Sequence, residues 1–75
     1  RPDLKDLKSN IAVAYFNKGA LQFNEKQYEK AIELYKKAIE YNPDLKVAYL
    51  GISKSYIALG NSKESKIWEE KAKKK

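Results

Sequence analysis

The sequence predicts an all-α domain of two tandem antiparallel helix-turn-helix repeats, about four helices in all. Apolar residues recur at helical spacing along most of the chain, and polar, proline-containing or glycine-containing breaks separate these stretches. Short sequences also recur 34 residues apart, because Val13-Ala14-Tyr15 returns as Val47-Ala48-Tyr49 and Lys37-Ala38 returns as Lys71-Ala72. Two matches that share one period indicate a repeated unit of about 34 residues and a helical-repeat fold.

The first hairpin is predicted from two amphipathic stretches. The first helix is expected from Ile11 to Phe23 and ends at the polar segment 24–27. The second helix is expected from Tyr28 to Ile39. It ends before Asn42-Pro43-Asp44, because proline lacks an amide donor and disfavours the helical conformation in the residue before it.

The second hairpin follows from cap signals. Asp44 is expected to cap a third helix that runs through Leu59, and Gly60 ends it because glycine adopts the left-handed conformation at little cost. Asn61 is expected to open a fourth helix, with Glu64 three residues later completing a capping-box-like pair. The connections are short, so consecutive helices should be antiparallel neighbours.

Residues 1–11 form a leader with two possible interpretations. Leu4 and Leu7 continue the helical spacing backwards and Pro2 suits a first helical turn, so the leader is expected to extend the first helix. The competing interpretation treats residues 1–8 as the stub of a preceding helix.

Composition excludes most enzyme chemistry. A chain of 75 residues has a thin core, since a domain of this size buries about 60% of its unfolded surface. Cysteine and histidine are absent, which removes disulfides, thiolate nucleophiles and the usual zinc ligands. The sequence therefore predicts a protein that is not an enzyme and needs no cofactor or metal.

The net charge of +6 lies mostly at one end of the chain. Lys71, Lys73, Lys74 and Lys75 leave 12 basic against 10 acidic residues in the rest. Binding of nucleic acid or an anionic surface through this lysine tail is a weaker alternative function. No apolar run approaches the roughly 18 residues of a membrane span, and a cytoplasmic location is the default expectation.

With this pattern the sequence resembles the tetratricopeptide repeat family, whose unit is two antiparallel helices joined by a tight turn. In the first unit, residues 12–45, seven positions match the family signature in type and spacing: Tyr15, Gly19, Tyr28, Ala31, Tyr35, Ala38 and Pro43. The second unit, residues 46–75 with the basic tail, has Ser65 where alanine is usual and Glu69 where an aromatic residue is usual. We therefore expect a degenerate second repeat.

The second unit is also expected to be a capping repeat. Ile32 and Ile39 of the first unit correspond to Lys66 and Lys73 of the second. In stacked helical repeats this position faces the next unit, so a terminal unit needs polar residues there. A charged interface with another chain is the alternative interpretation of these lysines.

The resemblance implies that the first helices of the two units line a concave groove that binds peptides. Its positions in this sequence are Val13, Phe16, Asn17, Ala20, Phe23, Val47, Leu50, Gly51, Lys54 and Ile57. Some family members hold a peptide's terminal carboxylate with a lysine and an asparagine, and here Phe16 and Ala20 stand at those positions. The implied groove is therefore mainly apolar and lacks that clamp.

We predict a non-catalytic protein-interaction module whose groove captures a peptide or the apolar face of an amphipathic helix. The alternative is a self-associating scaffold, in which residues 1–10 or a second copy of the chain fill the groove and form a homodimer. Two repeats are fewer than the three usually needed for a stable stack, which favours such self-association. Phe16 and Phe23 are the residues whose substitution should distinguish the two hypotheses.

Overall fold

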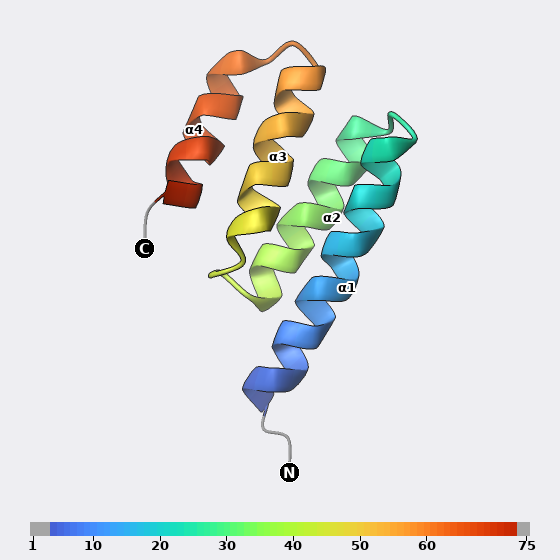
Figure 1. Cartoon of the computed structure of the whole chain (residues 1–75), viewed down its shortest axis with the longest axis vertical. Coiled ribbons are helices and arrows are strands. Elements are labelled where there is room, and N and C mark those ends of the chain that lie inside the picture. The colour runs from blue at the N-terminus through green and yellow to red at the C-terminus, as the bar shows by residue number, and fades with distance from the viewer. Residues whose placement is uncertain (1–3, 74–75) are drawn as a thin grey trace.

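The computed structural model of the chain describes residues 4–73, and the side chains from Leu7 to Lys73. This part consists of four helices: α1 Leu4–Asn24, α2 Tyr28–Tyr41, α3 Lys46–Ala58 and α4 Ser62–Lys73. Each helix packs against its neighbours in sequence, so that two helical hairpins lie side by side in one layer (Figure 1). The predicted all-α fold is confirmed. The expectations for Pro2, Lys74 and Lys75 lie outside the described residues.

Helix α1 begins seven residues earlier than the Ile11 start expected from the apolar spacing. It is continuous from Leu4 through Ile11 to Asn24, and its first turns project beyond the end of α2 in Figure 1. Leu7, on this projecting part, is half exposed. Residues 4–11 of the leader therefore form the beginning of α1.

The turn within each hairpin contains one residue in the left-handed backbone conformation. After α3, Gly60 has a φ of 81°, and the Asn61 N–H donates to the Tyr56 carbonyl at 2.8 Å. After α1, Lys26 has a φ of 65°, and the Gln27 N–H donates to the Gln22 carbonyl, also at 2.8 Å. This bonding satisfies helix-terminal carbonyls. The left-handed end predicted at Gly60 is confirmed, and Lys26 adopts it without the conformational freedom of glycine.

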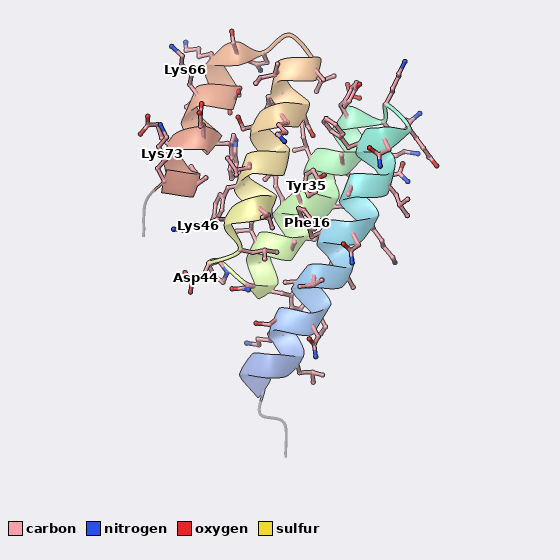
Figure 2. The ribbon with its side chains drawn as sticks, viewed as in Figure 1. Phe16, Tyr35, Asp44, Lys46, Lys66 and Lys73 are labelled. Carbon is pink, nitrogen blue, oxygen red and sulfur yellow. The ribbon has the colours of Figure 1, made fainter. Side chains whose placement is uncertain are left out.

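The predicted cap of the third helix at Asp44 is wrong. Helix α3 begins at Lys46, Leu45 occupies the cap position, and no side chain caps the helix there. Asp44 lies in the turn before Lys46 (Figure 2), where its N–H donates to Asn42 Oδ1 at 3.1 Å. The Asn42 side chain therefore closes this turn and places Asp44 one residue too early to cap α3.

The predicted capping of the fourth helix by the Asn61 side chain is confirmed. The Glu64 N–H donates to Asn61 Oδ1 at 3.3 Å, which satisfies an otherwise unpaired amide in the first turn of α4. Glu64 also places a negative charge in that first turn, where the helix dipole favours it.

Small side chains dominate the core. Alanines allow the helix backbones to approach closely, and Tyr35, Ile32 and Ile52 supply the larger apolar volume between them. Tyr15, Phe16, Tyr56 and Trp68 pack against this core from its margins. The core cluster consists of Ala12, Ala31, Ile32, Tyr35, Ala38, Ala48 and Ile52.

A buried pair of serines joins α3 to α4. Ser53 Oγ donates to the Ser65 carbonyl at 3.0 Å, and the Oγ atoms of the two residues are 2.8 Å apart. The corresponding residues of the first hairpin are Gly19 and Ala31. The serine at the usual alanine position is therefore accommodated because Ser53 pairs with it.

Replacing Ser53 should cost more stability than replacing Ser65. Ser53→Ala leaves the buried Ser65 hydroxyl without its partner, and we expect a loss of about 1–3 kcal/mol. Ser65→Ala keeps the bond from Ser53 to the main-chain carbonyl, so the expected loss is below about 1 kcal/mol. Urea unfolding of the two variants checks this order, and equal losses would contradict it.

The outer face of α4 is charged. Lys66 and Lys73 are exposed and extend from α4 on the side turned away from α3 (Figure 2). Ile32 and Ile39, at the corresponding positions of α2, are buried and partly buried instead. The difference arises because α3 covers that face of α2.

Trp68 packs α4 against the neighbouring helices. Its ring lies 6.0 Å from the ring of Tyr49, and the Nζ atoms of Lys36 and Lys71 lie 5.5 and 4.9 Å from its centroid. These are cation–π distances. Ile67, its neighbour in sequence, is exposed.

Candidate functional site

A hollow of about 270 Å³ opens between α1 and α3. Helices α1 and α3 are the first helices of the two hairpins, and both pack against α2. The walls of the hollow are formed by residues of these two helices and by one residue of α2. The lining residues are Phe16, Phe23, Tyr35, Val47, Leu50, Gly51 and Lys54.

The hollow includes one pair of equivalent positions of the repeat. Phe16 and Leu50 are 34 residues apart, so they stand on the same face of their respective helices. The parallel placement of α1 and α3 turns both faces to one side of the molecule. This pair places one large apolar side chain on each wall of the hollow.

Tyr35 is held between two glycines. A Cβ added at Gly19 would lie 2.8 Å from Cδ1 and Cε1 of the Tyr35 ring, and one added at Gly51 would lie 2.7 Å from Cε2 and Cζ. Heavy atoms cannot approach so closely, so both positions must lack a side chain. The two edges of the ring therefore pack directly against the backbones of α1 and α3.

Tyr35 lines the hollow although the residue as a whole is buried. Among the described residues its hydroxyl makes no hydrogen bond, and none of their fully buried side-chain oxygen or nitrogen atoms lacks a partner, so this hydroxyl retains contact with solvent. Burial raises the pKa of the Tyr35 hydroxyl above its ordinary value of 10.0. At neutral pH the group is therefore protonated and can donate a hydrogen bond.

Two phenylalanines connect the hollow to the core. The Phe16 ring lies 5.3 Å from the Tyr35 ring at an interplanar angle of 39°, and the two residues are neighbours in Figure 2. The Phe23 ring meets the Tyr28 ring edge-on at 5.2 Å. Because both phenylalanines pack against the core, substituting them also removes structural contacts. They are poor positions for separating binding from stability.

The structure brings together six of the ten residues predicted for the groove: Phe16, Phe23, Val47, Leu50, Gly51 and Lys54. Val13 and Ile57 are exposed on the same two helices but do not line the hollow. Asn17 is also exposed and Ala20 is partly buried, and both lie outside the lining as well.

Tyr35 is the lining residue that sequence reasoning did not place in the groove. Its position in the repeat predicted a core residue, which it also is. Gly51 among the groove positions is the signal that could have found it, because a glycine in the middle of a helix leaves room for a neighbouring side chain.

The lysine tail is only partly described. Lys71 is engaged with the Trp68 ring, and Lys73 ends α4. Within residues 4–73, no helix is long and apolar enough to cross a membrane. The same residues contain no group of three or more acidic side chains arranged to hold a metal ion.

The fold and its hollow define a class of protein, the helical-hairpin repeat that presents a surface formed by the first helix of each hairpin. Comparison with protein families gives a match to the tetratricopeptide repeat over residues 12–45, which comprise most of α1, all of α2 and the turn before α3. This segment is a tetratricopeptide repeat. Comparisons with curated proteins and with solved structures gave no match. Repeats of this family mediate protein–protein interactions and are non-catalytic.

Proposed function

We propose that the hollow between α1 and α3 binds a peptide or a helix of a partner protein. The observation that carries this proposal is the apolar lining left open to solvent on both walls. Val47 and Leu50 are among the exposed large apolar residues of the chain, and they stand beside the partly buried Phe16 and Phe23. Exposed apolar surface gathered in a concave place is typical of an interaction site.

The apolar surface continues beyond the hollow. Val13 on α1 and Ile57 on α3 are exposed on the same two helices. An amphipathic helix presents anchors at positions i, i+3, i+4 and i+7, so one helix could contact several of these side chains together. Complete burial of one large apolar side chain contributes about 1.5–3 kcal/mol before ordering costs are subtracted.

Self-association is the second hypothesis for the same surface. A second copy of the chain would bury the exposed leucine and valine equally well. The molar mass in solution, measured by sedimentation equilibrium over a range of concentrations, distinguishes the two hypotheses. A monomer leaves the hollow open to a peptide, whereas a dimer that Leu50→Ser dissociates would favour the self-associating scaffold.

Leu50→Ser should weaken peptide binding about tenfold, which corresponds to roughly 1.4 kcal/mol. The probe is a peptide selected from a displayed random library for binding to the wild-type chain, and fluorescence anisotropy gives its Kd. Leu50 is 42% exposed, so the substitution should leave the fold intact. Thermal unfolding of the variant checks this.

Leu59→Ser provides the matched control. Leu59 is 40% exposed and directly follows the last residue of α3, but it does not line the hollow. We expect the Kd of this variant to stay within about twofold of the wild-type value. Equal weakening by both substitutions would mean that the peptide does not bind in the hollow.

A further inference from the structure

We infer that the ligand of the hollow carries a carboxylate beside its apolar anchor, and that the Tyr35 hydroxyl and the Lys54 ammonium bind this carboxylate. The inference rests on the proposed function and specifies the chemistry of the partner: an acidic, apolar peptide segment. It gives Tyr35 a role in specificity in addition to its place in the core.

The position of the Tyr35 hydroxyl is set by the packing of its ring. The glycine contact on α3 is made partly by Cζ, the ring carbon that bears the hydroxyl, 2.7 Å from the place where a Gly51 Cβ would stand. The hydroxyl therefore emerges beside the backbone of α3. Because the other edge of the ring packs against Gly19, the ring cannot move away.

The hydroxyl is not needed for this packing. A phenylalanine ring would fill the space between the two glycines equally well. The oxygen makes no hydrogen bond among the described residues, and burial keeps its pKa above the ordinary value. At neutral pH one of the residues that line the apolar hollow therefore carries an unused hydrogen-bond donor.

Lys54 of α3 lines the same hollow as Tyr35. It follows Gly51 by three residues, a spacing that places the two positions on the same face of a helix. Among the seven lining residues, all within the described part of the chain, Lys54 is the one charged group and none is a carboxylate. A bound carboxylate would thus meet one cation, one hydroxyl donor and apolar walls.

Charge also argues against a second copy as the occupant. If two hollows packed face to face, each would contribute Lys54 and neither would contribute a lining carboxylate, so like charges would approach each other. The net charge of +6 adds a general attraction for acidic partners. An acidic partner segment satisfies both the local and the overall charge.

The first test is the composition of the selected peptides. A displayed random library is selected separately against the wild-type chain and Lys54→Glu. Against the wild type we expect enrichment of Asp or Glu at a constant distance from a large apolar residue. Against Lys54→Glu, enrichment of Lys or Arg should replace it. Apolar peptides without acidic enrichment would overturn the carboxylate inference and leave the proposed function standing.

The second test measures affinity for one selected peptide and for its Glu→Gln counterpart. The wild-type chain should prefer the acidic peptide about tenfold, and Lys54→Gln should reduce that preference to about twofold or less. Lys66→Gln is the matched control, because it removes the same charge from the outer face of α4. If both variants lower the preference equally, overall charge accounts for it and the inference fails.

Tyr35→Phe tests the hydroxyl separately. It keeps the ring, so the melting temperature should stay close to that of the wild type, while the Kd of the acidic peptide should rise about threefold to tenfold. An unchanged Kd would remove Tyr35 from the site. If Leu50→Ser leaves peptide binding unchanged, the proposed function itself fails, and this inference fails with it.

Discussion

Ile52→Ala should lower the free energy of unfolding by about 2–5 kcal/mol, because it creates a cavity in a core that has little other large apolar volume. Ile52 is 0% exposed and is among the largest fully buried side chains. A domain of this length has a total stability of only about 4–11 kcal/mol. The substitution should therefore reduce the melting temperature by about 8 °C or more, at roughly 4–8 °C per kcal/mol.

Ile57→Ala is the control for this prediction. It removes the same atoms from the same helix, but Ile57 is 60% exposed. We expect its loss to stay below about 1 kcal/mol, since little apolar surface returns to water. Urea unfolding of both variants gives the comparison. Similar losses would show that Ile52 does not occupy a close-packed core.

Gly51→Ala should destabilise the fold by about 1–3 kcal/mol, although alanine favours a helix over glycine by about 1 kcal/mol. The added Cβ would lie 2.7 Å from two carbons of the Tyr35 ring, and the ring is held on its other edge by Gly19. The steric conflict should therefore exceed the gain in helix propensity. Gly19→Ala should have a similar effect, because its Cβ would also approach the Ala31 carbonyl oxygen at 3.3 Å.

Two comparisons identify the cause of that loss. In a Tyr35→Leu background the smaller side chain vacates the space beside α3, so Gly51→Ala should become neutral or stabilising. At Gly60, an added Cβ meets no atom within 4 Å, but φ is +81°. Gly60→Ala should therefore destabilise through backbone strain of about 1 kcal/mol whichever residue occupies position 35. If Gly51→Ala stabilised the wild-type protein, the Tyr35 ring could not be packed directly against the backbone at Gly51.

Much of the candidate site followed from repetition in the sequence. Phe16 and Leu50 could be assigned to equivalent faces because each lies at the same place in a 34-residue period. Whether a residue on such a face lines a hollow depends on how far apart the two helices stand. Ile57 and Val13 satisfy the pattern, yet they lie outside the hollow.

The helix ends also include some that could be predicted from the sequence and some that could not. Gly60 could be predicted as a helix end because the preference of glycine for positive φ is local. Asp44 could not be placed correctly, because the Asn42 side chain competes for the turn and delays the start of α3. Lys26 carried no sequence signal of its left-handed conformation, which follows from the packing of the hairpin.

The sequence by itself determined the helices, their antiparallel order and the apolar character of the groove face, because periodicity and turn residues act over short distances. Only the tertiary structure decided that Tyr35 of α2 reaches between Gly19 and Gly51 and lines the hollow together with Lys54. That arrangement depends on the distances among three helices, and pairwise spacing along a chain contains no information about them. The match of two glycines to one ring becomes visible when α1, α2 and α3 are placed together.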